Sequence, residues 1–470
     1  MSFLPEAALA ELKDLLGPKG FSMESDVLAT HNAEARGKFE GHAEIILFPA
    51  STEEVAKAVA ICAAHDIAVV PQGGNTGRCG GAVASDKQVL INLKRMNRVI
   101  EIDDRDFTAT VEAGAILQHI QEAVEKQDLL FPLSLGAEGT CQIGGNLATN
   151  AGGLNVIRYG NARDLCLGLE VVLPDGTVWN GLSKLRKDNT GYDLRDLFIG
   201  AEGTLGIITK ATLKLFAQPK HTATAWIAVP SPECAIDLLA LARRHTGDGI
   251  AAFELISNFA HDLSVTYLQN LTRPLATKTP WHVLIELTSS RPNDDLETLL
   301  VDLLGQAVEI GLAVDATLAQ SEAQRKNLWA IREGIPEAQG YEGGSIKHDV
   351  SVPVSKVAEL IKRGMASADA LIPGIRPCPF GHVGDGNIHF NFTQPATMDK
   401  QAYLAQWESL NSVIHDIVVD LGGSISAEHG IGQLKRDELA HYASVEKLKL
   451  LRAIKVAIDP DGRLNPGKVV

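Results

Sequence analysis

Apolar and polar positions follow helical and strand periods in turn along the first half of the chain. Apolar residues recur at helical spacing over residues 52–64, and the run IAVV at 67–70 has the length and composition of a buried strand. A second helix is expected around residues 116–126. Further short strands are expected at 89–93, 98–103 and 108–114.

The second half has longer strands, separated by stretches with helical spacing. Strands are expected at 222–230, 251–257 and 282–290. This pattern predicts an open, mainly antiparallel sheet with helices on one face, and an α+β fold for the chain. The boundary between the two halves is expected at residues 216–221, where Gln218 and Pro219 interrupt the periodicity.

Length and charge limit the class of protein. A chain of 470 residues favours two or three domains, and 45% hydrophobic with 21% charged residues is typical of a globular protein. The formal net charge of −15 argues against nucleic acid or a membrane surface as the partner. A small anionic substrate would need a local cluster of positive charge or a bound cation.

Cysteine usage and the N-terminal residues bear on the compartment. The six cysteines are scattered without a CxxC pair, which suits free thiols in a reducing cytoplasm. The first residues, MSFLPEAALAELKDLLG, lack a basic region followed by an apolar core, and no apolar run is long enough to span a bilayer. We therefore expect a cytoplasmic protein without a membrane span.

Three glycine-rich segments in the first half are unusual for ordinary core. They are PQGGNTGRCGGA at 71–82, the segment 132–153 that contains IGGNLATNAGG, and DLRDLFIGAEGTLGIIT at 193–209. Glycines let backbone N–H groups approach a ligand without obstruction by side chains. Neither a Walker loop nor a GxGxxG that opens a helix is present. One such segment alone is often a tight loop, but three together predict a large nucleotide cofactor.

Metal-binding and acid/base residues concentrate in GHVGDGNIHFN at 381–391 and SAEHGIG at 426–432. The turn residues 384–387 predict a hairpin that brings His382 and His389 together across two antiparallel strands. Glu428 is the best candidate for a carboxylate ligand, and two His with one Glu leave positions open for water or substrate. His429 would be a base beside the ion. Asn391 shares the face of His389 because strand side chains repeat every second residue. A lone His in such a strand is usually a core residue, but this clustering favours a metal site.

These motifs together resemble a known family. The three glycine segments resemble the flavin-binding domain of the vanillyl-alcohol oxidase or p-cresol methylhydroxylase superfamily. The second half, with GHVGDGNIHFN, SAEHGIG and the ending DPDGRLNPGK, resembles the D-2-hydroxyacid dehydrogenase branch, which includes D-lactate dehydrogenases, glycolate oxidase subunits and D-2-hydroxyglutarate dehydrogenase. The resemblance extends from about residue 40 to the C-terminus. It implies a two-part FAD-binding domain over 1–218, a substrate domain over 219–430 with a large antiparallel sheet covered by helices, and a C-terminal segment, 431–470, that returns to the FAD domain.

The resemblance also implies which residues bind FAD. The pyrophosphate would lie on the first glycine loop, the rest of the cofactor on the second segment, and its adenosine end on the third, while Asn465 would fold back to the flavin. Members that bind FAD covalently through the first loop carry a histidine where this chain has Asn75, so noncovalent FAD is expected. The implied FAD residues are Gly73, Gly74, Asn75, Thr76, Gly77, Gly80, Gly81, Pro132, Gly136, Thr140, Gly144, Gly145, Asn150, Gly152, Gly153, Glu202, Gly206, Ile207 and Asn465.

In the second half the resemblance implies a divalent metal, zinc or manganese, on His382, His389 and Glu428, with Asn391 touching substrate and His429 as the catalytic base. Arg332 and Lys347 match cationic residues that hold the substrate carboxylate. An alternative is that Arg332 lies on an exposed helical face and pairs with Glu333 or Glu337. Members that take the five-carbon dicarboxylate carry a hydroxyl residue one turn after this arginine, where this chain has Pro336, so 2-hydroxyglutarate is less expected.

The expected function is metal-dependent oxidation of a D-2-hydroxy acid, D-lactate-like or D-2-hydroxyglutarate-like, to the 2-keto acid by hydride transfer to FAD. The expected partners are a small anionic substrate and an electron acceptor such as an electron-transfer flavoprotein, a cytochrome or a quinone, with a homodimer possible and no nucleic acid. Two other classes stay open. A metal-dependent hydrolase would not explain the three glycine segments. A flavin-binding electron-transfer or assembly subunit would not explain the expected metal ligands.

Overall fold

The computed structural model describes residues 4–34 and 37–470. Internal contacts divide the chain into two compact units. The first comprises Met1–Gly152, Gly160–Gln218 and Glu428–Val470, and the second comprises Gly153–Tyr159 and Pro219–Ala427. The domain bounds 1–218, 219–430 and 431–470 stay a prediction.

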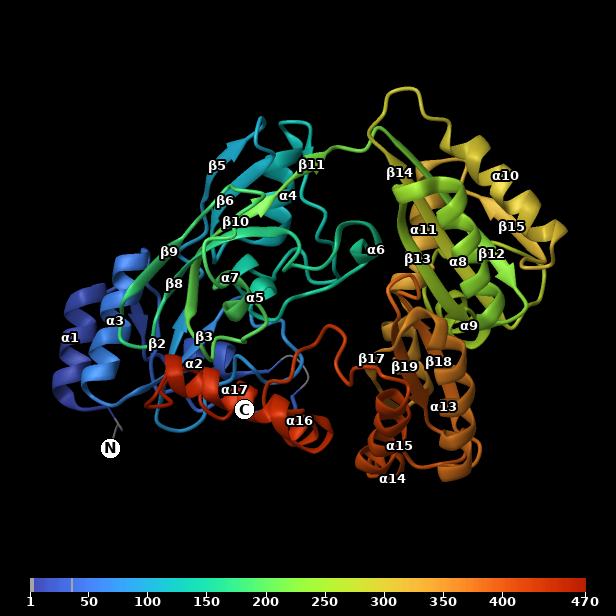
Figure 1. Ribbon diagram of the computed structural model, residues 1–470. Coiled ribbons are helices and arrows are strands. Elements are labelled where there is room, and N and C mark those ends of the chain that lie inside the picture. Colours follow the sequence, from blue (N-terminus) through green and yellow to red (C-terminus); the bar gives the residue numbers. More distant parts are fainter. Residues whose placement is uncertain (1–3, 35–36) are drawn as a thin grey trace. The chain divides into compact units, whose positions relative to one another are not determined.

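The first unit begins with a four-stranded sheet, in which a β-α-β crossover leads directly into the first glycine loop (Figure 1). Its two inner strands are parallel to each other, and α3 begins where the Ser51 hydroxyl accepts a hydrogen bond from Glu54 N–H. The expected helix 52–64 is confirmed. In sheet order the strands are β1 (Phe21–Ser22), β2 (Ile46–Leu47), β4 (Gln88–Asn92) and β3 (Ala68–Gln72), and the helices are α1 (Glu6–Leu16), α2 (Ser25–Asn32) and α3 (Thr52–Ala64).

The second sheet of this unit is antiparallel and carries the second and third glycine segments between its strands. Its order is β5 (Val99–Asp103), β6 (Thr108–Glu112), β10 (Ile207–Lys214), β8 (Cys166–Val172) and β9 (Val178–Gly181), and β7 (Leu129–Leu130) pairs with β11 (Phe216–Ala217) nearby. The helices here are α4 (Leu117–Glu125), α5 (Ile143–Ala148) and α7 (Arg195–Phe198).

The last residues of the chain also belong to the first unit. Helices α16 (Arg436–Tyr442) and α17 (Val445–Ile458), red in Figure 1, lead to a segment that runs beside β3. Val69 N–H donates to Arg463 (2.9 Å), and Asn465 N–H donates to Val69 (2.8 Å). These two bonds tie the NPGK segment to the strand that leads into the first glycine loop.

The second unit is built on the predicted large antiparallel sheet, which is confirmed. Every pairing in it is antiparallel. The order is β15 (Asp315–Leu318), β12 (His221–Val229), β14 (Trp281–Ser289), β13 (Ile250–Ser257), β18 (Arg376–Gly381), β19 (Asn387–Thr393) and β16 (Ser345–Ile346), and β17 (Asp349–Ser351) also pairs with β19.

The expectation that helices cover only one face of this sheet is wrong. Ile227 and Ile285 lie in a core beneath one set of helices, whereas their neighbours Trp226 and Leu284 lie in a second core beneath another set. The central strand β13 is buried at every position, so both of its faces need a cover. The first set is α8 (Pro232–Thr246), α10 (Leu296–Glu309), α13 (Val357–Leu371) and α15 (Trp407–Asp420), and the second is α9 (Asn258–Tyr267), α11 (Glu322–Glu333) and α12 (Ile335–Ala338).

Two short helices complete the second unit, α6 (Val156–Tyr159) and α14 (Lys400–Leu404). Within residues 4–34 and 37–470, no helix has the length and apolar character needed to cross a membrane.

Candidate functional site

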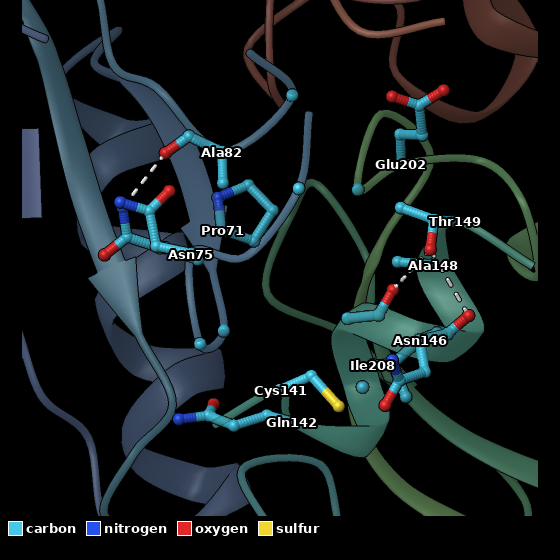
Figure 2. A pocket seen from close by; sticks show the side chains of 18 of the residues that line it. Pro71, Asn75, Ala82, Cys141, Gln142, Asn146, Ala148, Thr149, Glu202 and Ile208 are labelled. Carbon is cyan, nitrogen blue, oxygen red and sulfur yellow. Dashed lines mark hydrogen bonds between the residues drawn. The ribbon is translucent and has the colours of Figure 1, made fainter. Parts of the chain in front are cut away.

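The first unit contains a pocket whose walls come from all three glycine segments. Figure 2 shows Pro71 and Ala82 on one side, Asn146 of α5 and the following Thr149 on the other, and Glu202 above Thr149. About 1000 Å³ of empty space, part of it open to solvent, lies between them, which suits a large cofactor. The residues expected to bind FAD that line this pocket are Gly73, Gly74, Asn75, Thr76, Gly77, Gly81, Gly144, Gly145, Glu202, Gly206 and Ile207.

Glycines in the pocket wall have two different roles. A Cβ on Gly74 would lie 2.2 Å from the Thr140 carbonyl oxygen, and one on Gly144 would lie 2.7 Å from the Ala113 side chain. These glycines are needed for close backbone packing. A Cβ on Gly145 would meet no atom of the described residues within 4 Å. Gly145 therefore keeps space open in the pocket itself.

Buried polar atoms of the pocket fit a cofactor that offers hydrogen-bond donors. Gln142 and Asn146 line it, and among the described residues Gln142 Oε1 and Asn146 Oδ1 have no hydrogen-bond partner. Buried acceptors without partners are rare in folded proteins. The flavin and adenine rings carry N–H groups of the kind these oxygens need. The glycine pattern predicted the pocket, but neither of these two side chains.

The other residues expected to bind FAD do not line the pocket as the structure describes it, and some support it from behind. Asn465 donates from its side chain to the carbonyls of Gly81 (2.9 Å) and Glu202 (2.7 Å). Asn150 accepts a hydrogen bond from Arg163 N–H. Gly153 belongs to the second unit. The members of this group are Gly80, Pro132, Gly136, Thr140, Asn150, Gly152, Gly153 and Asn465.

Glu202 holds the SAEHGIG segment at the pocket wall. Its buried carboxylate accepts hydrogen bonds from the backbone N–H groups of Ile431 (2.7 Å) and Gly432 (2.8 Å). Burial raises the pKa of Glu202, and the two N–H donors oppose that rise. His429, two residues before Ile431, lines the pocket. The residue expected to be the catalytic base thus faces the space proposed for the flavin.

In the second unit, the predicted hairpin is confirmed. Strands β18 and β19 pair with Phe380 opposite His389, and His382 follows β18 directly. The rings of His382 and His389 are 5.3 Å apart, centre to centre, and nearly perpendicular. Gly386 takes a φ of +88° in the turn, where its backbone leaves no room for a side chain beside Val352. The hairpin therefore places two imidazoles side by side at one end of the sheet.

Arg332 is buried and paired, so the alternative of an exposed helical face is wrong. Its side chain extends from α11 over the Phe380 ring, with the guanidinium carbon 4.9 Å from the ring centre. Its Nε donates to Glu254 of β13 (2.6 Å). Among the described residues, Arg332 Nη2 is buried and has no hydrogen-bond acceptor.

Glu254 also contacts His382, through its other oxygen. Its Oε1 lies 2.6 Å from His382 Nδ1, and the side chain is fully buried. Burial by itself would raise the pKa of Glu254, but the charge of Arg332 and the hydrogen bonds from His382 and Arg332 outweigh it and hold that pKa at about 2. Sequence reasoning missed this residue. Its one signal was a carboxylate in the middle of AAFELIS, an otherwise apolar strand.

The remaining substrate candidates also lie in the second unit. Asn391 is opposite Cys378 in the sheet and donates to Gln339 Oε1 (3.0 Å), on the side of the sheet that α11 and α12 cover. Lys347 Nζ donates to the Pro336 carbonyl oxygen (3.3 Å). Glu428 and His429, by contrast, belong to the first unit by their internal contacts. Their place in one site with these residues is therefore a proposal.

Known proteins that resemble the chain agree with both halves of this description. Residues 43–181 match the family model "FAD binding domain", and residues 218–469 match "FAD linked oxidases, C-terminal domain". The chain is 40% identical to a probable mitochondrial D-2-hydroxyglutarate dehydrogenase of Oryza sativa subsp. indica, over all of this chain and 82% of that protein. It is 35% identical to a D-2-hydroxyglutarate dehydrogenase of Stutzerimonas stutzeri, over 98% of each. It is 36% identical to a putative mitochondrial D-lactate dehydrogenase of Schizosaccharomyces pombe, over 99% of this chain and 90% of that one.

Solved structures share the fold at low identity. A p-cresol methylhydroxylase with substrate bound has a TM-score of 0.76 and 19% identity, over 98% of this chain and 96% of that one. An alkyldihydroxyacetonephosphate synthase has a TM-score of 0.76 and 19% identity, over 99% of this chain and 86% of that one.

The chain belongs to the FAD-linked oxidases, and it shares its fold with p-cresol methylhydroxylase. Within them it is an FAD-dependent D-2-hydroxyacid dehydrogenase. The expected family, fold class and FAD cofactor are confirmed. Metal dependence, the electron acceptor and the oligomeric state stay predictions. Cytoplasmic location is not confirmed, because several relatives are named as mitochondrial.

Proposed function

We propose that the chain oxidises D-2-hydroxyglutarate to 2-oxoglutarate and requires a divalent metal ion. The observation that carries the proposal is the arrangement in the second unit, where the buried Arg332, with one donor lacking an acceptor among the described residues, shares Glu254 with a histidine of the His382–His389 pair. A buried guanidinium of this kind suits a substrate carboxylate. Relatives named for D-2-hydroxyglutarate support this choice of substrate.

The proposed metal ligands are His382, His389 and Glu428. Ala427 N–H donates to the carbonyl of Asp349 (3.2 Å), and Asp349 pairs with His389 in the sheet. Glu428 is the next residue, and consecutive Cα atoms are about 3.8 Å apart, so chain connectivity keeps its backbone close to this strand pair. Two nitrogens and one oxygen suit zinc or manganese and leave room for a substrate oxygen. When bound, the cation lowers the pKa of the substrate hydroxyl.

The chain's own residues have separate roles in this proposal. Arg332 and Lys347 bind the carboxylate beside the hydroxyl-bearing carbon, and Asn391 contacts the substrate from β19. His429 accepts the proton of the hydroxyl at an imidazole nitrogen, which suits its place in the wall of the flavin pocket. FAD bound in the pocket would supply the acceptor for the hydride from the same carbon.

We propose that FAD is held without a covalent bond. Asn75 lines the pocket with its backbone at a φ of +54°, and its side-chain amide donates to the carbonyl of Ala33 (2.7 Å). An amide at this position offers no imidazole nucleophile for the flavin ring. Acid denaturation should therefore release all of the FAD into solution, and flavin that precipitates with the polypeptide would refute this point.

D-Lactate is a second candidate substrate, favoured by Pro336. The proline stands one turn beyond Arg332, where it offers no hydroxyl donor, and its carbonyl oxygen is engaged by Lys347. A substrate without a distal carboxylate needs no such donor.

The test of the proposed function is a panel of D- and L-2-hydroxy acids assayed with an artificial dye acceptor. We expect kcat/KM to be highest for D-2-hydroxyglutarate, with turnover of the L enantiomer at least a hundredfold lower. A preference for D-lactate would replace the proposed substrate with the second candidate. A flavin-loaded enzyme that turns over none of the D-2-hydroxy acids would refute the proposal.

A further inference from the structure

Glu254 is a fully buried carboxylate whose two oxygens have different partners. It lies in the middle of β13, with Oε2 on Arg332 Nε and Oε1 on His382 Nδ1, each at 2.6 Å. Arg332 comes from α11 and His382 from the end of β18, so one side chain joins three elements of the second unit. Both partners belong to the proposed site, and Glu254 itself belongs to neither the ligand set nor the substrate contacts.

The contact with His382 determines which ring nitrogen carries the proton. An ionised carboxylate only accepts hydrogen bonds, so His382 Nδ1 must be the donor. The proton of the neutral ring is then on Nδ1, and Nε2 carries the lone pair. This is the tautomer that a metal ligand needs. Carboxylates that hold a ligating histidine in this way typically improve metal affinity by about ten- to a hundredfold.

The contact with Arg332 determines the plane of the guanidinium. Its Nε is committed to Glu254, and the Phe380 ring lies against its face. Rotation about the last bonds of the side chain is therefore restricted. The Nη2 group, which is buried and has no acceptor among the described residues, is left for an incoming anion.

We infer that Glu254 is a positioning residue that serves both halves of the proposed site: it fixes the metal-binding tautomer of His382 and the carboxylate-binding orientation of Arg332. The inference rests on the proposed function, because it assigns His382 to the metal and Arg332 to the substrate. Without Glu254, the metal and the substrate should both bind more weakly, although Glu254 is not proposed to contact either of them.

A matched control lies one strand away. Glu286 of β14 is also buried, and it accepts two hydrogen bonds from Arg325 of the same helix α11 (2.8 and 2.9 Å) and one from Trp329 (2.8 Å). It contacts neither Arg332 nor a histidine in the described part of the chain. Replacing Glu286 removes the ion pair of another buried sheet carboxylate with α11 and leaves Glu254, Arg332 and His382 themselves unchanged.

The experiment compares Glu254→Gln with Glu286→Gln in flavin-loaded protein. A glutamine side chain offers one acceptor where the site needs two, so it cannot serve both His382 and Arg332. After metal removal, the affinity for Zn²⁺ or Mn²⁺ is measured by competition with a chromogenic chelator, and kcat and KM are measured at saturating metal. We expect Glu254→Gln to bind metal at least tenfold more weakly and to raise KM at least tenfold. Excess metal should restore most of kcat but leave KM high.

Glu286→Gln should keep the metal affinity and KM within about twofold of the parent, even if its melting temperature falls as much as that of Glu254→Gln. A parent enzyme that works without metal would refute the proposed function. A metal-dependent parent whose Glu254→Gln variant matches Glu286→Gln in metal affinity and KM would overturn the inference alone. If Glu254→Gln does not fold, Glu254→Asp serves instead. Its shorter side chain cannot reach both partners, so parental values for both constants would equally overturn the inference.

Discussion

At the scale of single residues, the proposed function gives His429 and Arg332 different roles toward the substrate, as the base and as the carboxylate anchor. His429 lies in the wall of the flavin pocket in the first unit, and Arg332 is buried in the second. A positioned base matters only as the proton moves, whereas a carboxylate anchor contributes to both the ground state and the transition state. Substitutions at the two positions should therefore affect different kinetic constants.

We expect His429→Ala to retain bound flavin and near-parental substrate affinity while the rate of flavin reduction falls by about a hundredfold or more. Arg332→Ala should instead raise KM strongly and lower the rate less. Anaerobic stopped-flow reduction of both variants separates these effects. If His429→Ala reduces its flavin as fast as the parent, another residue is the base.

Lys468 is a second residue whose chemistry is testable. Its side chain is 2% exposed, and among the described residues its ammonium has no hydrogen-bond partner. Burial lowers the pKa of Lys468 from 10.5 to about 8. Three residues earlier, Asn465 bonds to Gly81 of the pocket wall. We expect this buried ammonium to pair with an anionic group such as the FAD pyrophosphate when FAD is bound.

The lowered pKa of Lys468 predicts in which direction pH changes the stability of the flavin-free protein. Between pH 8 and 10.5 the unfolded chain holds a proton on Lys468 that the folded chain has lost, so this residue makes stability rise with pH there. Lys468→Met should lack that rise. At pH 7 it should melt roughly 1 °C higher for each kcal/mol that the charge costs. It should also gain less stability from added FAD.

Lys455→Met is the control for this measurement, because Lys455 donates to Asp459 and to the carbonyls of Thr204 and Leu464. Removing a partnered ammonium should lower the melting temperature. Thermal melts from pH 7 to 10, with and without FAD, test the pair of variants. A flavin-free Lys468→Met protein that melts below the parent at pH 7 would contradict the account.

At the scale of elements, hydrophobic periodicity located the long strands and helices well. The expected helix 52–64 is α3 itself, and the strand expected at 251–257 is β13 with one residue added. Periodicity failed where a strand is buried on both faces, because such a strand has no polar side to show which face is covered. It also could not find Glu254, whose partners Arg332 and His382 are 78 and 128 residues away in sequence.

The two adjacent glycines of α5 offer an element-scale prediction. Gly144→Ala should destabilise the flavin-free protein, because its Cβ would meet Ala113 at 2.7 Å. Gly145→Ala should leave that stability unchanged or raise it by up to ~1 kcal/mol, since alanine favours a helix. The same variant should weaken FAD binding, because its methyl group enters the pocket.

Melting curves of flavin-free protein and FAD titrations followed by fluorescence measure both effects. Gly145→Ala with parental FAD affinity would mean that the cofactor does not occupy the space beside α5.

At the scale of the whole molecule, the residues proposed to bind flavin and those proposed to bind substrate and metal come mainly from different units. The flavin pocket is formed by the first unit, and the histidine pair with Arg332 and Glu254 is formed by the second. Motif spacing predicted residues in both, because glycine turns and a histidine hairpin are local in sequence. Hydrogen bonds between residues that are distant in sequence, such as those from Ile431 and Gly432 to Glu202, depend on the fold. No sequence motif indicates them.

Because the flavin pocket lies in the first unit and two of the three proposed metal ligands, His382 and His389, lie in the second, we expect that the metal can be removed while FAD stays bound. The most direct test of the central claim is anaerobic reduction of the flavin by D-2-hydroxyglutarate before and after chelation. We expect the chelated enzyme to stay yellow, with FAD bound but not reduced by substrate, and added Zn²⁺ or Mn²⁺ to restore reduction. Metal-free enzyme, verified by elemental analysis, that reduces its flavin as fast as the untreated protein would contradict the account.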